Sequence, residues 1–469
     1  MAGKVILVGA GPGDPGLLTL KGRRALEQAE VVVYDRLVDE ELLALIPADV
    51  ERIDVGKNAG NHPVPQHEIN QILLRKAQEG RRVVRLKGGD CFVFGRGGEE
   101  LELLAANEID FEVVPGVTSA LAAPAYAGIP ATHRNFCASV HIITGHRRRD
   151  EALTLDYEAL VRLDGTLIFL MSVATFGEIA QGLMAAGMAS DFPCAIVENG
   201  TRPEQRKWLT TVSGAAACIA QGVRSPAIFV VGRVCGLSET MDWFDGRPLK
   251  GRRILVPRPR PDSHRLAELL SERGARVIEL PAPSAEYLPV EVPGAGETLA
   301  LTAAEAADAL MTALENTGLD ARALAGCRLC CVGKDAVHGL QKYGLRPDWS
   351  GEIDALEEED CTLLCREDEA ARFAALAPRA KVCPAWRVRM EQAAPIDLDS
   401  VDFVAFTTLS SVQAFAQATE GKRPTGVRAV CIGARTAEAA RALGMDAVQS
   451  AEMTLESMTA RLEALCAGE

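Results

Sequence analysis

Short apolar runs alternate with amphipathic segments along the first quarter of the chain. The run Lys4–Gly9 is apolar after its first residue, whereas Leu17, Leu20 and Leu26 recur at intervals that place them on one helical face. This alternation predicts βαβ units, and therefore a mostly parallel sheet covered on both faces. The expected elements are strands at Lys4–Gly9, Glu30–Tyr34, Arg82–Lys87 and Phe111–Val114 and helices at Leu17–Gln28, Gln66–Glu79 and Gly98–Asn107.

A second series of apolar runs follows Gly116. Charged and turn-forming residues then become more frequent across Ser238–Arg253, which we interpret as a linker. The strands expected before this linker are His141–Thr144, Thr166–Met171, Cys194–Val197 and Ala227–Val231.

A third series begins at Arg253 and contains a weak internal repeat. Arg328–Gly344 resembles Arg428–Gly444, and each reads as a strand, a glycine turn and a helix that ends in glycine. The repeat predicts two similar lobes. Glu286–Thr298, which is rich in proline, glycine and glutamate, reads as a connection.

Composition narrows the possible partners. The chain has 469 residues, too many for one hydrophobic core, and its 48% hydrophobic and 24% charged residues are those of an ordinary globular protein. The alternating pattern of strands and helices makes its expected class α/β. A net charge of -14 and an aromatic content of 5% argue against nucleic-acid binding. An anionic ligand would therefore need a local basic pocket.

Cysteine usage and the amino terminus indicate the compartment. The 13 cysteines show no disulfide framework, and the Cys327/Cys330 pair lacks a second pair at zinc-site spacing, so we expect reduced thiols in a cytoplasmic protein and no metal. The first residues read as a strand rather than a secretory leader, and no stretch of 18 apolar residues follows. We expect no membrane association.

The glycine-rich loop after the first strand departs from a dinucleotide-binding loop. That pattern needs glycine at position 14, where Asp14 would repel a pyrophosphate, and Pro12 and Pro15 lack the N–H groups that a phosphate uses. Asp35, about 20 residues further on, keeps NAD binding open as an alternative. The loop favours a cationic or neutral nucleotide-like ligand such as S-adenosylmethionine.

Glycines and charged residues crowd into Arg85–Glu100, directly after a predicted strand. Glycines allow a backbone to approach a ligand closely, and Asp90 beside two of them could bind ribose hydroxyls or an amino group. A plain turn is the alternative, but it explains poorly the five glycines Gly88, Gly89, Gly95, Gly97 and Gly98.

Cationic side chains gather in the same part of the chain. Arg96 and Glu99 share a helical face at their spacing, and Arg134 and the run His146–Arg149 add positive charge. In an acidic chain this concentration suggests a pocket for carboxylates, which arginine binds through paired hydrogen bonds. A surface ion pair and a solvated loop are the alternatives.

These motifs resemble those of the uroporphyrinogen-III C-methyltransferases, which belong to the tetrapyrrole methylase family. The resemblance covers about residues 1–240, and the Arg85–Glu100 run points to this member of the family. Cys91 departs from it, because it stands where the family usually has proline, and it could make the site sensitive to oxidation. The matching stretches are Val8–Gly22, Val33–Leu37, Arg85–Glu100, Val114–Ala120, Ala125–Arg134, Thr144–His146 and Glu198–Gln205.

The resemblance implies two methyl transfers from S-adenosyl-L-methionine to uroporphyrinogen III, which give precorrin-2 through precorrin-1. It also implies a homodimer, with Asp35 as general base and Lys57 as general acid. Arg96, Glu99 and Arg134 would hold the macrocycle and assist its deprotonation. The residues implied for the methyl donor are Pro12, Gly88, Gly89, Asp90, Val93, Thr118, Ser119, Met171 and Gly200.

From about residue 250 the chain resembles, more weakly, uroporphyrinogen-III synthase, which closes hydroxymethylbilane with inversion of one ring. Val256–Pro259, Asp402–Phe415 and Ile432–Ala437 carry this resemblance. Ala300–Glu305 departs from the turn that this family has in its first lobe, and Trp386 stands where the family often has tyrosine. Tryptophan cannot donate a phenolic proton. The residues that could bind propionates are Arg258, Thr407, Thr408, Ser410 and Thr436.

Two alternatives therefore stay open for the second half. It is either an active synthase or a degenerate tetrapyrrole-binding or scaffold domain, and its threonines are either ligands or ordinary helix caps. Together the resemblances imply a methyltransferase domain at 1–245, with subdomains at about 1–115 and 116–245. They also imply a bilobal domain at 250–469, with lobes at about 250–284 plus 388–469 and 285–387.

Overall fold

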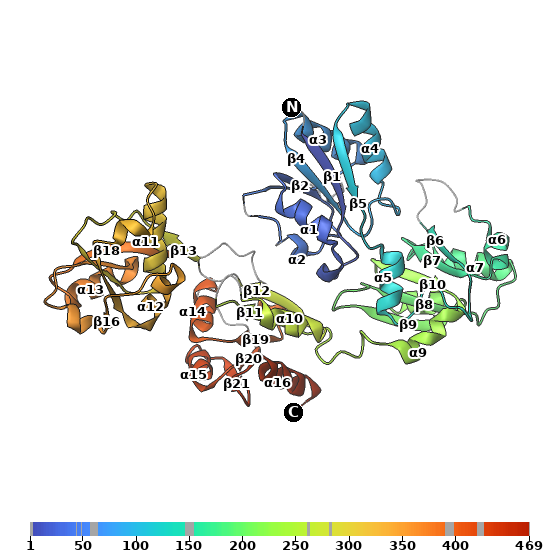
Figure 1. Ribbon diagram of the computed structural model, residues 1–469. Coiled ribbons are helices and arrows are strands. Elements are labelled where there is room, and N and C mark those ends of the chain that lie inside the picture. Colours follow the sequence, from blue (N-terminus) through green and yellow to red (C-terminus); the bar gives the residue numbers. More distant parts are fainter. Residues whose placement is uncertain are drawn as a thin grey trace. The chain divides into compact units, whose positions relative to one another are not determined.

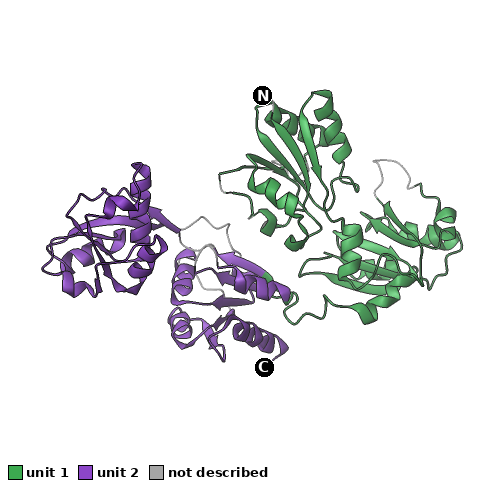
Figure 2. Cartoon of the chain, in the orientation of Figure 1, with its two compact units in different colours: residues 1–252, 273–276 green, residues 253–272, 277–469 purple. Residues whose placement is uncertain are grey.

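The computed structural model describes most of the chain. The described residues are 3–43, 45–47, 49–56, 64–145, 154–259, 263–280, 284–389, 398–419 and 426–468. The chain divides into two compact units (Figure 2): unit 1 is Met1–Arg252 with Arg273–Arg276, and unit 2 is Arg253–Glu272 with Val277–Glu469.

The first sheet of unit 1 has five parallel strands in the order β3-β2-β4-β1-β5 (Figure 1), as the βαβ pattern predicts. Ile6 and Val8 pack on one side of the sheet and Val5 and Leu7 on the other, because successive side chains alternate along a strand. The strands are β1 (Lys4–Gly9), β2 (Val31–Tyr34), β3 (Glu51–Asp54), β4 (Arg82–Lys87) and β5 (Asp110–Val114).

Helices cover both faces of this sheet. Buried residues of α1 lie in the same cluster as Ile6 and Val8, and buried residues of α3 and α4 pack against Val5 and Leu7. The helices are α1 (Leu20–Glu27), α2 (Glu40–Leu43), α3 (Gln66–Gln78) and α4 (Gly97–Ala106), with a short 3-10 turn at Pro15–Leu17.

The second sheet of unit 1 is mixed, in the order β6-β7-β10-β8-β9. Only β6 and β7 are parallel, and the other neighbours run antiparallel. Its strands are β6 (Val140–Thr144), β7 (Thr166–Leu170), β8 (Pro193–Glu198), β9 (Arg206–Thr211) and β10 (Ala227–Val231). Its helices are α5 (Ser119–Tyr126), α6 (Tyr157–Arg162), α7 (Phe176–Ala185), α8 (Ala215–Ala220) and α9 (Ser238–Met241).

The stretch whose composition resembles a linker packs within unit 1. Phe244 and Leu249 are buried, and Trp243 donates its indole N–H to the Ala125 carbonyl at 2.9 Å. Arg247 lies over the rings of Trp243 and Phe244. Residues 238–252 therefore belong to unit 1, with Phe244 and Leu249 buried, and the interpretation of this stretch as a linker is wrong.

Unit 2 contains two sheets. The first has the order β12-β11-β19-β20-β21. Its strands are β11 (Arg253–Pro257), β12 (Arg276–Leu280), β19 (Phe403–Phe406), β20 (Arg428–Cys431) and β21 (Asp446–Gln449). Its helices are α10 (Arg265–Glu272), α14 (Leu409–Ala418), α15 (Ala434–Ala442) and α16 (Leu455–Ala467).

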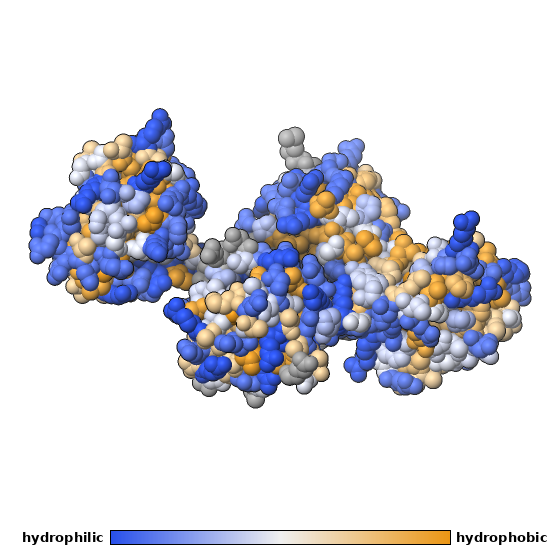
Figure 3. Space-filling model, turned by 60° about the horizontal axis from the view of Figure 1, so that its bottom comes forward, coloured by the Kyte–Doolittle hydropathy of each residue, from blue (hydrophilic) through white to orange (hydrophobic). Residues whose placement is uncertain are grey.

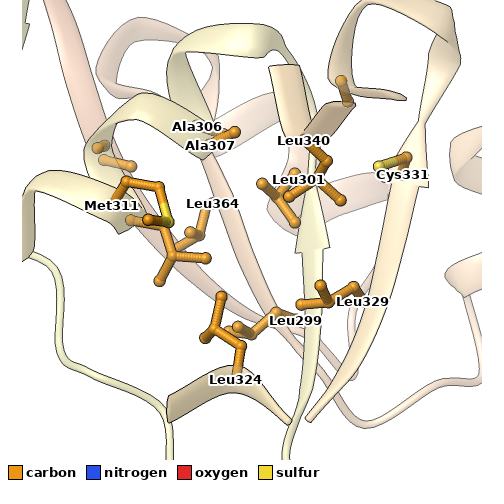
Figure 4. Packing of buried hydrophobic residues seen from close by; sticks show 14 of the residues in the cluster. Leu299, Leu301, Ala306, Ala307, Met311, Leu324, Leu329, Cys331, Leu340 and Leu364 are labelled. Atoms are coloured by element: carbon orange, nitrogen blue, oxygen red, sulfur yellow. The ribbon is translucent and has the colours of Figure 1, made fainter. Parts of the chain in front are cut away.

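The second sheet of unit 2 has the order β13-β18-β17-β14-β15-β16. Figure 4 shows part of its core, in which Leu299 and Leu301 of β14 cluster with Met311 and Leu340. Its strands are β13 (Ser284–Tyr287), β14 (Thr298–Leu301), β15 (Arg328–Val332), β16 (Trp349–Gly351), β17 (Thr362–Arg366) and β18 (Lys381–Arg389). Its helices are α11 (Ala304–Asn316), α12 (Gly333–Lys342) and α13 (Ala370–Leu376).

The internal repeat is confirmed as two equivalent strand–helix units, β15–α12 and β20–α15. Each helix is followed by a glycine with positive φ, 73° at Gly344 and 80° at Gly444. The connection expected at Glu286–Thr298 is wrong at its start, because Glu286 and Tyr287 belong to β13 and pair antiparallel with β18.

None of the described helices is long and apolar enough to cross a membrane. On the face shown in Figure 3, hydrophobic residues are interspersed among hydrophilic ones.

Candidate functional site

The loops that follow β1 and β4 are joined through their backbones. Gly89 N–H donates to the Gly11 carbonyl at 2.7 Å, and Gly11 N–H donates to the Gly89 carbonyl at 3.2 Å. Because carboxyl ends of neighbouring parallel strands meet at one edge of a sheet, this contact defines the edge where ligands of α/β proteins bind.

Three glycines, Gly9, Gly89 and Gly116, form what we call the glycine junction. A Cβ on Gly116 would lie 2.3 Å from the Gly89 carbonyl oxygen, and one on Gly9 would lie 2.5 Å from the Gly116 Cα. Gly89 also has a φ of 70°, which favours glycine. These glycines let the strand ends of β1, β4 and β5 approach closely.

The Asp90 carboxylate holds this edge together. Its Oδ1 accepts the N–H groups of Phe92 (2.8 Å) and Val93 (3.1 Å), and its Oδ2 accepts the Gly116 N–H at 3.0 Å. Gly116 leads to Thr118, whose side chain caps α5. The structure thus brings Gly88–Val93 together with Thr118 and Ser119, and both Asp90 oxygens serve the backbone.

Asp14 has a role that the sequence interpretation did not anticipate. Its Oδ2 accepts a 2.6 Å hydrogen bond from the Tyr126 hydroxyl, and its N–H donates to Thr201 Oγ1 at 3.1 Å. Half-burial and the adjacent carboxylate raise the pKa of Tyr126. Asp14 therefore joins the loop containing Pro12 to α5 and to the turn after Gly200, so its charge is no argument for a cationic ligand.

Strained backbone accumulates around this edge. Non-glycine residues with positive φ cost free energy and cluster at functional sites in proteins. Arg96 has a φ of 58° and Thr201 of 74°. Gly200 belongs to the same strained turn, and a Cβ there would lie 2.3 Å from that of Ala123.

A buried cluster of charged side chains lies at the same end of the sheet. The Arg85 guanidinium donates from Nη2 to Asp35 Oδ1 at 2.5 Å and from Nε to Glu100 Oε1 at 3.1 Å. Lys87 Nζ donates to the same Glu100 oxygen at 2.8 Å. Burial lowers the pKa of Arg85, but the two carboxylates outweigh it and raise the pKa overall. Asp35 is thus held by a cation.

Arg96 and Glu99 form an exposed pair at the start of α4, with Nε 3.2 Å from Oε1. A hydrogen bond from the Glu99 backbone lowers the pKa of the Glu99 carboxyl most, and the Arg96 side chain lowers it further. Asn70 of α3 donates to the Glu99 carbonyl at 3.0 Å. The pair is therefore anchored at the backbone while its charged ends face solvent.

Some expected site residues are not joined to this edge. Among the described residues, no hydrogen bond or ion pair links Arg134 or Met171 to the glycine junction, and both are exposed. Lys57 and the run His146–Arg149 lie outside the described residues.

Sequence reasoning missed Arg85, Lys87 and Glu100. The signal was present in β4, where Arg85 and Lys87 alternate with Val84 and Leu86 and so share the face that packs against α4. Two cations on a covered strand face need buried acidic partners, and Glu100 is such an acid on the helix that follows.

Cys91 is fully buried, and desolvation raises the pKa of its thiol to about 12. A thiol of this kind reacts slowly, because the thiolate is the reactive form. The expectation that Cys91 makes the site sensitive to oxidation is therefore wrong.

In unit 2, several expected ligands lie at the carboxyl ends of β11 and β19. Arg258 Nη1 lies 3.2 Å from His264 Nε2, whose ring is 3.1 Å from Glu279. The Thr407 hydroxyl oxygen is buried and has no hydrogen-bond partner among the described residues.

The other hydroxyl residues expected as ligands in unit 2 are Thr408, Ser410 and Thr436. Thr408 caps α14 in a capping box with Ser411, as the helix-cap alternative predicts, and its hydroxyl is 2.9 Å from that of Ser410. Thr436 is buried in α15. Trp386 is a buried core residue of β18 and pairs with Tyr287 on β13.

Comparison with known proteins follows the same division. Residues 4–216 match the family described as tetrapyrrole (corrin/porphyrin) methylases, and residues 264–359 and 375–460 match uroporphyrinogen-III synthase HemD. The fold and the matches define an α/β tetrapyrrole methylase followed by a HemD-like domain.

The porphyrin biosynthesis protein HemD of Ruminiclostridium josui is 42% identical over 491 aligned residues, which cover 98% of this chain and 97% of that protein. The chain belongs to this family, in which a tetrapyrrole methylase is fused to a uroporphyrinogen-III synthase-like domain. Siroheme synthase 2 of Yersinia enterocolitica is 54% identical over 245 residues, 52% of this chain and 51% of that protein.

A crystal structure of uroporphyrin-III C-methyl transferase from Thermus thermophilus, complexed with S-adenyl homocysteine, is 42% identical. It covers 50% of this chain and 100% of its own, with a TM-score of 0.44.

Proposed function

We propose that unit 1 methylates uroporphyrinogen III twice, giving precorrin-2 through precorrin-1, with S-adenosyl-L-methionine as donor. The observation that carries this proposal is the meeting of the glycine junction with the Asp35–Arg85 pair at one sheet edge. A close backbone approach suits a nucleotide-like ligand, and a carboxylate at the same edge suits proton removal.

The residues at the glycine junction fit such a donor. Gly88, Gly89 and Val93 present backbone groups beside Asp90, whereas Pro12 offers no N–H to a phosphate. Pro12, Gly88, Gly89, Asp90, Val93, Thr118, Ser119, Met171 and Gly200 would hold the donor. When bound, it supplies an electrophilic methyl group.

Asp35 is proposed as the general base. When a pyrrole carbon gains a methyl group, the ring becomes a cationic iminium, which must then lose a proton. The Asp35 carboxylate is 33% exposed, so it is open to a bound macrocycle while Arg85 holds it. Lys57 is proposed as general acid. Arg96, Glu99 and Arg134 are proposed to hold the macrocycle and assist its deprotonation, with the two arginines binding substrate carboxylates.

An Asp35→Asn variant tests this role. We expect methylation of uroporphyrinogen III to fall by about 100-fold or more, because general-base assistance is lost. S-adenosylhomocysteine binding, measured by calorimetry, should be retained. Methylation at the rate of the unmodified enzyme would exclude Asp35 as the base.

For unit 2 we propose cyclisation of hydroxymethylbilane to uroporphyrinogen III. Arg258 and Thr407 support this proposal, because a cation and an unpartnered hydroxyl follow adjacent strands of one sheet. Thr408, Ser410 and Thr436 complete the proposed substrate-binding set. The alternative is a degenerate tetrapyrrole-binding domain, favoured by the capping role of Thr408 and the buried Trp386.

The full chain, incubated with hydroxymethylbilane and no methyl donor, distinguishes these alternatives. An active synthase yields uroporphyrinogen III, whereas spontaneous closure yields the uninverted isomer I. Isomer I alone would support the degenerate domain.

We further propose a cytoplasmic homodimer that acts in sirohaem or cobalamin formation. All 13 cysteines are free thiols, which supports a reducing compartment. Sedimentation analysis tests the dimer.

A further inference from the structure

The buried charged cluster of unit 1 consists of Asp35, Arg85, Lys87 and Glu100. The side chains of Arg85, Lys87 and Glu100 are 2%, 4% and 0% exposed. Removing charges from water is costly, and a buried ion cluster is often no more stabilising than apolar residues of the same volume. Its position at the candidate site therefore calls for a functional explanation.

Arg85 links the two carboxylates of the cluster. Besides the hydrogen bonds to Asp35 and Glu100, its Nη1 lies 3.4 Å from the carbonyl oxygens of Val33 and Leu86. These contacts engage all three nitrogens of the guanidinium. A planar guanidinium held in this way fixes the direction of its hydrogen bond to Asp35, which a lysine ammonium cannot do.

Glu100 fixes Arg85 in turn. Its Oε1 accepts hydrogen bonds from Arg85, from Lys87 and from Gln66 Nε2 at 3.1 Å, whereas its Oε2 has no partner among the described residues. Lys87 and Arg85 therefore share Glu100. The second terminal nitrogen of Arg85 is left for Asp35.

We propose that Arg85 is a positioning residue for methyl transfer, which holds the Asp35 carboxylate in the orientation that accepts the substrate proton. This inference rests on the proposed role of Asp35. In that step a C–H bond beside the iminium breaks, its electron pair forms a C=C bond that neutralises the iminium, and the proton moves to an Asp35 oxygen. Arg85 acts only through Asp35.

Two substitutions of Arg85 test the proposal in the full chain. Arg85→Lys keeps the positive charge but loses the planar guanidinium. Arg85→Gln removes the charge, while Lys87 still pairs with Glu100. Both variants are therefore expected to fold. We expect kcat to fall by about 10- to 100-fold with KM for uroporphyrinogen III changed less than about three-fold. Calorimetric S-adenosylhomocysteine binding should be unchanged.

The split between kcat and KM separates positioning from a structural role. A structural loss would also weaken S-adenosylhomocysteine binding, whereas a misoriented Asp35 lowers kcat alone. Arg85→Lys, which keeps the charge but not the planar guanidinium, should therefore not restore kcat.

Arg23→Gln is the matched control, because it breaks an exposed arginine–glutamate pair of 2.8 Å on α1 and should change nothing. If both Arg85 variants keep the kcat of the unmodified enzyme while Asp35→Asn is inactive, the positioning role is overturned and the base is retained. If Asp35→Asn is active, the proposed function itself fails.

Discussion

Three glycines determine how closely the strand ends of the first sheet approach one another. Gly9, Gly89 and Gly116 come from three different strand ends. A Cβ on Gly9 or Gly116 would meet backbone, and Gly89 has a positive φ that favours glycine. Backbone cannot move aside as a flexible side chain can. At the residue scale, the site is therefore defined as much by absent side chains as by charged ones.

A Gly116→Ala substitution should separate these strand ends. Its Cβ would lie 2.3 Å from the Gly89 carbonyl oxygen, so we expect a stability loss of about 1–3 kcal/mol in urea. S-adenosylhomocysteine binding should also weaken. Gly98→Ala is the control, because a Cβ there has no neighbour within 4 Å; equal losses in both variants would contradict this account.

Cys91 should resist alkylation in the native protein. With a pKa of about 12, its thiolate fraction at pH 8 is about one part in ten thousand, and the residue is fully buried. Mass spectrometry after iodoacetamide treatment should find Cys137, which is partly exposed, modified first. Equally rapid modification of Cys91 would show that this loop opens.

At the scale of elements, Asp14 and Tyr126 connect the loop after β1 to α5. The same loop reaches the turn after β8 through Thr201. The aromatic ring of Tyr126 packs 4.9 Å from that of Phe244, so the 238–252 stretch is part of this connection. One tyrosine therefore joins segments from distant parts of unit 1.

Tyr126→Phe should destabilise unit 1 by about 2 kcal/mol, because a hydrogen bond to a charged group is lost. The raised pKa of Tyr126 stabilises the folded state below pH 10, the ordinary tyrosine value, and that contribution is lost as pH rises above it. The difference in the free energy of unfolding between Tyr126→Phe and the unmodified protein, measured in urea, should therefore shrink above pH 10.

Tyr343→Phe is the control for that measurement. Tyr343 makes a similar 2.6 Å hydrogen bond to Asp308, but in unit 2. It should alter only the unfolding of unit 2. A difference between Tyr126→Phe and the unmodified protein that stays constant above pH 10 would contradict the linkage.

Hydrophobic periodicity predicted several strands with apolar cores and missed two strands that are mainly polar. β1, β4 and β7 are buried runs, and each was expected close to its observed bounds. β3, with the sequence Glu-Arg-Ile-Asp, and β9 were missed, because both lie at sheet edges and carry mainly polar residues. Edge strands are defined by a neighbouring backbone, which periodicity does not report.

At the scale of the whole molecule, each unit has its own hydrophobic clusters. Those around Val8, Leu7, Phe169 and Ile168 consist of unit 1 residues. Those around Leu301, Phe406 and Leu363 consist of unit 2 residues. Each unit can therefore unfold as a separate cooperative transition.

Calorimetry of the full chain should accordingly show at least two unfolding transitions. S-adenosylhomocysteine should raise the midpoint temperature of only one of them. At a ligand concentration of 100 times Kd, the stabilisation is about 2.7 kcal/mol. The Gly116→Ala substitution should reduce that shift. A shift of every transition would show that ligand binding is coupled to unit 2.

The sequence by itself determined the α/β class, the repeat in the second half and the residues that resemble a tetrapyrrole methylase, because periodicity and motifs are local properties. Only the tertiary structure revealed that Arg85 joins Asp35 to Glu100, which also binds Lys87, that Asp14 binds Tyr126 and that Cys91 is inaccessible. Each of these facts depends on segments distant in the chain, and their contacts are set by packing rather than by neighbouring residues.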